Sequence, residues 1–340
     1  MITKVVKSYK NIFICTAYND LKYILFLISK VSDEENLIIV SNVESLYEFV
    51  LTIRDETYDV ISIKSKVKSI YNPLQWCEEF CELANLRAFS KRQNNAKIYT
   101  ISMYFDITSL FLSCHLHKEN QLLLITSDCL YGEFAPIPHT LYTLFCKAFY
   151  NIPLRNFSTS TITAIGLDER FVRKNVANYF INNEEDISNA IQNKISIPCE
   201  NSFILFIISK YEENILDPLL LKGLIQFFEI KYSNSSIVIK GHPREGEAEV
   251  FKDFEVIRID AKVPVEFIDT TLCEAIIGVS SVALAYFANQ NIKVYSFVEG
   301  INDKSTVELY KKYLIEHSRN INFLIKSEID TSSMQFNNFF

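Results

Sequence analysis

The sequence predicts an α/β protein of two lobes, each built on a parallel β-sheet, with the two sheets facing a central cleft. Three observations favour this fold class. Short apolar runs alternate with amphipathic stretches early in the chain, a polar and turn-rich region interrupts them, and a second alternating series follows. Apolar strands separated by helical segments are typical of βαβ units and parallel sheets.

In the first series, each apolar run ends in polar turn residues, as in "NIFICTAYN" and "NLIIVSN", and a helical pattern follows. Asn19 or Asp20 is the expected cap of the first helix, and Pro73 is the expected start of the third. The expected strands cover residues 11–19, 36–42, 58–65, 97–105 and 121–128. The expected helices cover residues 20–32, 44–55 and 73–92, and the segment 107–117 separates the last two strands.

The second series begins after residue 200 and follows the same rules. Its expected strands lie within residues 201–214, 236–243, 254–261 and 293–299. Its expected helices cover residues 217–233 and 264–273, and residues 274–290 read as strand, turn and helix. We therefore expect an N-terminal lobe over 1–155, a connection over 156–200, a C-terminal lobe over 201–325 and a tail over 326–340.

Composition excludes several classes of protein. The 340 residues are 49% hydrophobic and 22% charged, which is enough apolar material for two cores and argues against disorder. The net charge of -7 and the lack of a dense basic stripe argue against nucleic acid as a partner. Small basic groups do occur around Lys4, Lys7 and Lys10 and around Lys64, where they could touch an anionic membrane surface.

No apolar run reaches the length of a membrane span, and no secretory signal is present, so a cytoplasmic protein is expected. The eight cysteines include no CxxC pair, which favours reduced thiols over a zinc site. The seven glycines are isolated, and this excludes GxGxxG, P-loop and GxSxG motifs.

The segment "IVIKGHPRE" ends a predicted strand with Lys240, Gly241, His242 and Pro243. The neighbouring proline restrains the backbone of His242. Imidazole titrates near neutrality and can donate a proton to a departing phosphate, while Lys240 is expected on the same side of the extended chain. The alternative is a histidine that only bonds a backbone carbonyl.

Two further segments of the second lobe suit a phosphorylated ligand. In "AIIGVSSVALAYF", Ser280 and Ser281 open an apolar helix, and helix N-termini bind phosphate through free N–H groups and the helix dipole. In "VPVEFID", Glu266 could accept hydrogen bonds from ribose hydroxyls. The alternatives are an ordinary serine cap and an ordinary first-turn glutamate.

The order and spacing of "KGHP", "PVEF" and "GVSS" resemble those of bacterial sialyltransferases with the GT-B fold, the lipooligosaccharide sialyltransferases and capsule polysialyltransferases. The opening "NIFICTAYNDLKYIL" is similar to the first strand and turn of the lipooligosaccharide group. The resemblance implies two Rossmann-like lobes and inverting transfer of sialic acid from CMP-sialic acid to a glycan, without a metal or other cofactor.

The resemblance also implies residue roles. His242 would assist departure of CMP, and Ser280 and Ser281 would hold its phosphate. Lys240 would lie by the cytosine and Glu266 by the ribose, with Gly241 and Pro243 shaping the donor site. The acceptor would be a galactose-type or sialic acid terminus on a lipid-linked or capsular glycan, with the enzyme in the bacterial cytoplasm or peripheral on the inner membrane.

The general base is where the sequence departs from the family, which has two acidic residues followed by glycine. The matching segment here reads "LLLITSDCLYGEF", in which Asp128 is followed by Cys129. We predict Asp128 as the base, with Glu133 and Asp106 as alternates; a turn-forming aspartate is the structural alternative. A transferase for another CMP-sugar such as CMP-Kdo, or a non-catalytic nucleotide-sugar-binding protein, would carry the same phosphate site.

Overall fold

The chain divides into two compact units, residues 1–192 and 193–340. The structure is a computed structural model, and it describes residues 7–64, 73–100, 120–125, 163–166, 178–181, 187, 191, 195–199, 201–243, 245–318, 320–325 and 327.

The first unit is built on a parallel sheet whose described strands follow the order β3-β2-β1-β4-β5-β6-β7. The strands are β1 (Asn11–Cys15), β2 (Asn36–Ser41), β3 (Tyr58–Ile63), β4 (Lys97–Thr100), β5 (Gln121–Ile125), β6 (Thr163–Gly166) and β7 (Asn178–Ile181). β1 is fully buried at the centre, where the Phe13 ring stacks on Tyr99 of β4 at a centroid distance of 4.5 Å. β2 is buried throughout as well, and such buried apolar runs explain why these two strands were predictable.

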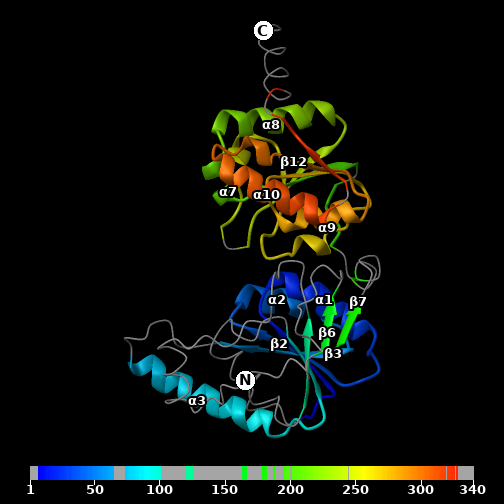
Figure 1. The fold of residues 1–340 in the computed structure, drawn as a ribbon, viewed down its shortest axis with the longest axis vertical. Helices are drawn as coiled ribbons and strands as arrows, with labels where there is room; N and C mark the ends of the chain where they lie inside the picture. The colour runs from blue at the N-terminus through cyan, green and yellow to red at the C-terminus, as the bar shows by residue number, and fades with distance from the viewer. Residues whose placement is uncertain are drawn as a thin grey trace. The chain divides into compact units, whose positions relative to one another are not determined.

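The described helices of this unit are α1 (Tyr18–Ser29), α2 (Glu44–Thr52) and α3 (Pro73–Ser90). α1 and α2 lie along one side of the strands and α3 along the other (Figure 1), as right-handed crossovers on either side of β1 require. Pro73 begins α3 as predicted. The predicted cap of α1 was wrong, because the N-cap is Ala17 and Asp20 instead lies in the first turn.

β6 and β7 fall inside residues 156–200, the expected connection between the lobes. They extend the first sheet beyond β5 through parallel pairs such as Leu124 with Ala164 and Ala164 with Tyr179. Each strand has only four residues, so its apolar run was too short to be recognised.

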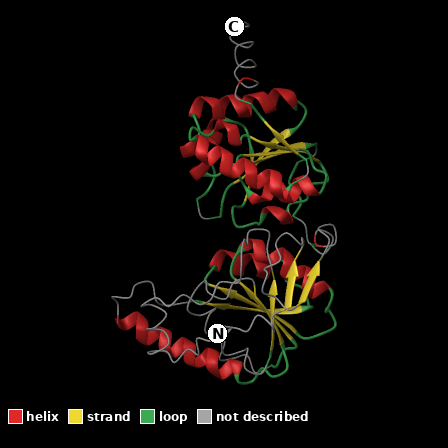
Figure 2. Cartoon of the chain, in the orientation of Figure 1, coloured by secondary structure: helices red, strands yellow, loops and turns green. Residues whose placement is uncertain are grey.

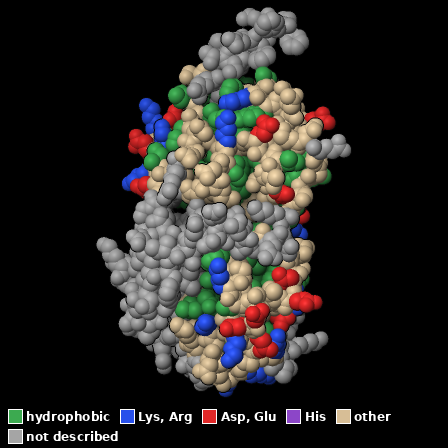
Figure 3. Space-filling model, turned by 90° about the vertical axis from the view of Figure 1, so that its right-hand side faces the viewer, with side chains coloured by type: hydrophobic (Ala, Val, Ile, Leu, Met, Phe, Trp, Pro, Cys, Tyr) green, Lys and Arg blue, Asp and Glu red, His purple; other side chains and the backbone are tan. Residues whose placement is uncertain are grey.

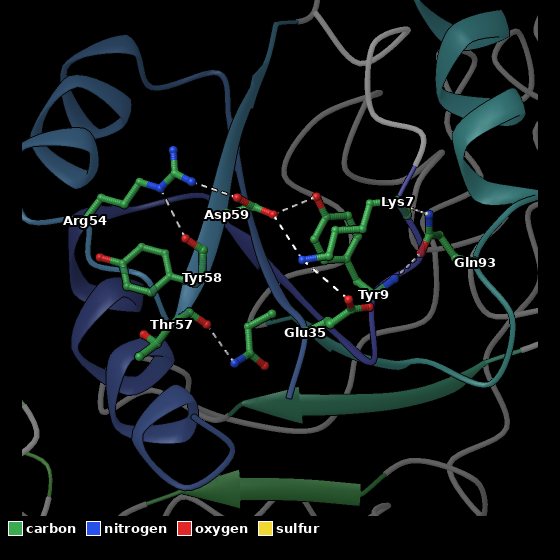
Figure 4. A network of polar contacts seen from close by, with 9 residues as sticks. Lys7, Tyr9, Glu35, Arg54, Thr57, Tyr58, Asp59 and Gln93 are labelled. Carbon is green, nitrogen blue, oxygen red and sulfur yellow. Dashed lines mark hydrogen bonds and ion pairs between the residues drawn. The ribbon is translucent and has the colours of Figure 1, made fainter. Parts of the chain in front are cut away.

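A network of polar contacts lies at the amino ends of β1, β2 and β3 (Figure 4). Asp59, at the start of β3, accepts a 3.1 Å hydrogen bond from the Tyr9 hydroxyl and pairs with Arg54 at 2.7 Å. Lys7 bridges Glu35 and Asp59 at 3.6 and 3.7 Å. Burial is the main cause of the raised pKa of Tyr9, and the negative charge of the Asp59 carboxylate raises this pKa further. These contacts tie this edge of the sheet together.

The second unit has its own parallel sheet, with described strands in the order β10-β9-β8-β11-β12-β13. The strands are β8 (Phe203–Ile207), β9 (Ser236–Lys240), β10 (Ile257–Ile259), β11 (Cys273–Gly278), β12 (Val294–Ser296) and β13 (Ile321–Phe323). The α-helices are α7 (Lys210–Ile215), α8 (Pro218–Lys231), α9 (Val282–Asn289) and α10 (Lys304–His317). The described residues of this unit also form the 3-10 helices η4 (Glu249–Asp253), η5 (Val265–Phe267) and η6 (Val298–Gly300).

Both faces of the second sheet are covered, as the helices and strands in Figure 2 illustrate. One face of β8, β9 and β11 packs on α8 and η4, with Phe206 in edge contact with Phe228 and Phe251. A Cβ added to Gly278 would lie 2.9 Å from the carbonyl oxygen of Ile207 and 3.0 Å from the Leu284 side chain of α9. Glycine at the end of β11 therefore fits a position where both β8 and α9 approach closely.

Several elements of the second unit differ from expectation. The helix expected over residues 264–273 is reduced to η5, and the expected loop after β8 contains α7. α10 and β13 were not predicted. Pro218 at the start of α8 and the strand, turn and helix of β11 and α9 confirm the pattern of the second series.

Exposed charges of the two signs are intermixed on the described surface shown in Figure 3. Two of the lysines considered for membrane contact are paired with carboxylates, Lys7 with Glu35 and Asp59, and Lys64 with Glu44 at 2.5 Å. Among the described residues, no helix combines the length and hydropathy needed to cross a bilayer.

Candidate functional site at the carboxyl edge of the second sheet

The second sheet has a topological switch point at β8, because β9 continues to one side of this strand and β11 to the other. Crevices outside the carboxyl ends of parallel strands at such a point are the usual ligand sites of open α/β sheets. Lys240 is the last residue of β9 and is followed by Gly241, His242 and Pro243, while Ser280 and Ser281 follow β11. Two strand spacings, roughly 10 Å, separate these strand ends.

The loop after β9 is a tight turn that presents His242. His242 and Gly246 exchange backbone N–H···O bonds of 2.9 and 2.8 Å, and Gly246 has a φ of +82°. A Cβ on Gly241 would lie 2.7 Å from the backbone nitrogen of Glu247, so glycine is required where the loop closes. The His242 side chain is exposed, and Pro243 lies within the turn. The close approach at Gly241 explains why a glycine precedes this histidine.

Lys240 is placed inward rather than beside the exposed imidazole. It is only 4% exposed, and its ammonium donates to the carbonyl oxygens of Gly241 at 2.5 Å and Ala261 at 3.0 Å. Burial lowers the pKa of Lys240 to about 8, while the carboxylates of Glu266 and Asp260 act in the opposite direction. Lys240 therefore ties the end of β9 to the turn after β10.

Glu266 lies in η5, is 6% exposed, and interacts electrostatically with Lys240. η5 also contacts α9, whose N-terminus carries the two serines. The structure thus brings Lys240 and Glu266 together, in an element that borders α9.

Ser281 is the N-cap of α9, and its hydroxyl accepts a 3.3 Å hydrogen bond from the N–H of Ala283. The predicted cap is confirmed. It gives the Ala283 N–H an acceptor, and the Leu284 N–H donates to the Ser281 carbonyl at 3.0 Å. The positive end of the helix dipole at this N-terminus favours an anion.

Ser280 makes contacts that sequence reasoning missed. Its N–H and hydroxyl both donate to Oε1 of Glu212, at 3.1 and 3.2 Å. Glu212 is 6% exposed, and its Oε2 accepts from the N–H of Ser209 at 2.9 Å. The pattern Ser209-x-x-Glu212 is a capping-box sequence, so the start of α7 was readable, although its link to Ser280 was not.

The loops that follow β8, β9 and β11 are joined to one another. Ser209, after β8, forms an isolated bridge with Glu247 at the base of the His242 turn. Through Glu212, the same β8 loop reaches Ser280 after β11. The segments carrying His242 and the two serines therefore lie on one connected edge of the unit.

The predicted base, Asp128, and its alternates Glu133 and Asp106 lie outside the described residues. The first unit does place a buried carboxylate after its own switch strand, β1. Asp20 accepts hydrogen bonds from the Thr16 N–H, the Thr16 hydroxyl and the Ala17 N–H at 2.8 to 2.9 Å. Burial raises the pKa of Asp20 to about 6, and these three bonds oppose the shift. Because its side chain is enclosed, Asp20 organises the turn between β1 and α1.

Within the described part of the chain, no three histidine, cysteine, aspartate or glutamate side chains gather as a metal site. Lys240, whose pKa is lowered by burial, already donates hydrogen bonds from its ammonium to two backbone carbonyls. The donors suited to an anionic ligand are the His242 imidazole, the start of α9 and the Ser280–Ser281 hydroxyls.

Comparison with known proteins supports the fold class. The sequence matches no protein-family model, and no curated protein matches it in sequence. The S. aureus MnaA–UDP complex superposes with a TM-score of 0.50 at 13% identity, covering 91% of this chain and 88% of that one. UDP-GlcNAc 2-epimerase from Methanocaldococcus jannaschii gives 0.51 at 11% identity, covering 96% and 92%.

A sialyltransferase from Photobacterium damsela is a weaker match, with a TM-score of 0.43 at 12% identity over 94% of this chain and 82% of that one. Similarity of that degree does not distinguish one function from another. The two stronger matches show the fold, which is GT-B-like: two α/β units, each on a parallel sheet.

Proposed function

We propose that this chain is an inverting sialyltransferase, which moves sialic acid from CMP-sialic acid to a bacterial surface glycan. The observation that supports the proposal most directly is the connected edge around β8. There the His242 turn and the Ser280–Ser281 helix start flank one switch point, with Glu266 in the neighbouring η5.

In the proposed reaction, the bond between the anomeric carbon of sialic acid and the CMP phosphate breaks with the electron pair going to phosphate oxygen. His242 donates a proton to that oxygen, and the positive end of the α9 dipole stabilises its charge. A glycan hydroxyl attacks the opposite face of the anomeric carbon and passes its proton to a carboxylate, for which Asp128 is our candidate. The charge that develops on phosphate is met by protein donors, so the proposal includes no metal.

The roles of the other predicted residues are adjusted to the contacts described above. Lys240 holds the loop beneath the donor site, since its ammonium is engaged by two backbone carbonyls. Gly241 lets the His242 turn close, and Pro243 lies within that turn. Glu266 remains our candidate for the ribose hydroxyls.

Two other donors are tested by the same experiment. A CMP-Kdo transferase would use the same phosphate site, and proteins of similar fold include a UDP complex and a UDP-GlcNAc 2-epimerase. A non-catalytic protein would bind nucleotide without turnover. The acceptor is proposed to be a lipid-linked or capsular glycan, reached from the cytoplasmic side of the membrane.

The deciding experiment incubates the full chain with CMP-sialic acid, CMP-Kdo or UDP-GlcNAc and a panel of glycan acceptors in the presence of EDTA. Mass spectrometry detects transfer, and NMR of the product reports the anomeric configuration. We expect CMP release and transfer with inversion from CMP-sialic acid alone. Turnover of only CMP-Kdo or UDP-GlcNAc, or binding without turnover, would exclude the sialyltransferase.

A further inference from the structure

The two hydrogen-bond donors of Ser280 that could hold a phosphate already bind another group of the protein. Both the N–H and the hydroxyl of Ser280 point to a single oxygen, Oε1 of Glu212. The acceptor is a carboxylate, which carries negative charge on oxygen as a phosphate does. Glu212 therefore stands where an incoming phosphate oxygen would bind Ser280.

Glu212 is held in this place by a second contact. Its Oε2 accepts from the Ser209 N–H, and its own N–H donates to the Ser209 hydroxyl at 3.2 Å. This capping box fixes the backbone of α7, but it needs only one of the two carboxylate oxygens. The contact with Ser280 is thus separable from the cap.

We propose that Glu212 is an internal competitor for the nucleotide phosphate, occupying the Ser280 donors until a phosphate displaces it. The inference rests on the proposed function for the identity of the ligand. When phosphate binds, the Glu212 side chain releases Oε1 from Ser280 while Oε2 keeps the cap of α7. Glu212 then sets the affinity of the site without touching the reacting atoms.

The energetic consequence follows from competition for the same donors. If the Ser280 donors are free in only one molecule in ten, the apparent affinity for phosphate is lowered roughly tenfold relative to an open site. A site of this kind favours ligands with enough charge to displace a carboxylate. Phosphate esters meet this requirement better than neutral sugars do.

The experiment compares Glu212→Gln with Glu213→Gln in the full chain. Glutamine retains one acceptor oxygen for the Ser209 cap, so the Ser280 donors become free. Glu213 is the matched control because it is the adjacent residue of α7, carries the same charge, and accepts instead from the N–H groups of Glu249 and Val250. A general loss of negative charge affects both variants, whereas release of Ser280 affects only the first.

Binding of CMP and, separately, of inorganic phosphate is measured by isothermal titration calorimetry. We expect E212Q to bind both probes roughly tenfold more tightly than wild type and E213Q. Glu212→Asp, which keeps the charge but shortens the reach to Ser280, should also bind more tightly, and it serves if E212Q does not fold.

Affinity that is unchanged or weaker in E212Q and E212D overturns the inference, because Glu212 would then help to build the site or take no part in it. A different result separates the inference from the function. If E212Q binds phosphate more tightly than E213Q but no variant turns over CMP-sialic acid, the competitor role stands and the sialyltransferase fails.

Discussion

At the scale of single residues, His242 carries the most specific chemical role. Its side chain is exposed, and only its backbone closes the turn with Gly246, so truncation of the side chain should leave the core of the unit intact. We expect His242→Ala and His242→Gln to lower the turnover number for CMP release by roughly 10²- to 10⁴-fold, the usual contribution of a general acid. The free energy of unfolding, measured by thermal denaturation, should stay within about 0.5 kcal/mol of the wild-type value, as for most surface substitutions. Wild-type turnover in either variant would remove His242 from the mechanism.

Asp20 makes a prediction about stability and pH. Its pKa is raised to about 6 in the folded chain, against 3.8 as the ordinary value. Between these pH values the folded state holds a proton that the unfolded state has lost, so stability falls as pH rises from about 4 to 6. The shift corresponds to about 3 kcal/mol at neutral pH. Asp20→Asn should remove this part of the pH dependence, as measured by urea unfolding at pH 4, 5, 6 and 7.

Asp303 provides the opposite case as a control. It caps α10 by accepting from Thr306 and Ser305, and these bonds lower its pKa to about 2. Its stabilisation is present above the ordinary pKa and is lost only as pH falls toward 2, so Asp303→Asn should leave the slope between pH 4 and 7 nearly unchanged. If the free energy of unfolding changes equally with pH in wild type and in Asp20→Asn, the pKa of the Asp20 carboxyl is not raised.

Residue chemistry was predictable only where the partners are close in sequence. The glycine before His242 and the serine cap of α9 were readable because turns and helix starts depend on local backbone rules. The pairing of Glu212 with Ser280 was not, since 68 residues separate them. The inward placement of Lys240 also depends on a carbonyl 21 residues away.

At the scale of elements, the loop after β9 depends on close packing at Gly241. A methyl group there would clash with the backbone of Gly246 and Glu247 and push apart the two ends of the turn. We expect Gly241→Ala to cost about 1–3 kcal/mol of stability, as overpacking does, and to weaken CMP binding because the His242 turn opens. Denaturant unfolding and calorimetric titration would measure the two effects.

Gly246→Ala is the matched control in the same loop. A Cβ at this position meets nothing within 4 Å, so the cost arises only from the left-handed backbone at φ +82°. That strain is about 1–2 kcal/mol, and the Gly241 contact is retained. CMP affinity that falls equally in both variants would show that close packing at Gly241 has no separate role.

Elements were predictable in proportion to the length of their apolar pattern. The buried runs of β1, β2 and β8 and the apolar α9 are unmistakable. α10 was missed because its described residues have a single fully buried member, Leu314, with Val307 and Tyr310 partly buried. The six-residue α7 and the three-residue β13 are shorter than the windows in which periodicity can be detected.

At the scale of the whole molecule, alternation of strands and helices predicts parallel sheets but not their strand order. The switch at β8 arises because β9 and β11 both pair with it, although β11 follows it by more than 60 residues in the chain. Pairing over such separations depends on packing of whole faces. Thus the sequence indicated which residues end strands, while the structure was needed to show that these ends share one edge.

The second unit carries its own sheet and a buried core drawn from β8 through Leu324, all within residues 193–340. A domain with a separate core can fold alone. We therefore expect a fragment of residues 193–340 to unfold cooperatively. Its affinity for CMP should lie within about fivefold of that of the full chain, which is about 1 kcal/mol of binding free energy. It should not transfer sialic acid, because Asp128, the predicted base, belongs to residues 1–192. Circular dichroism melts, calorimetry and the transfer assay test each part. A folded fragment that transfers sugar would place the base in the second unit, and a folded fragment that binds no CMP while the full chain does would move the donor site away from the edge around β8.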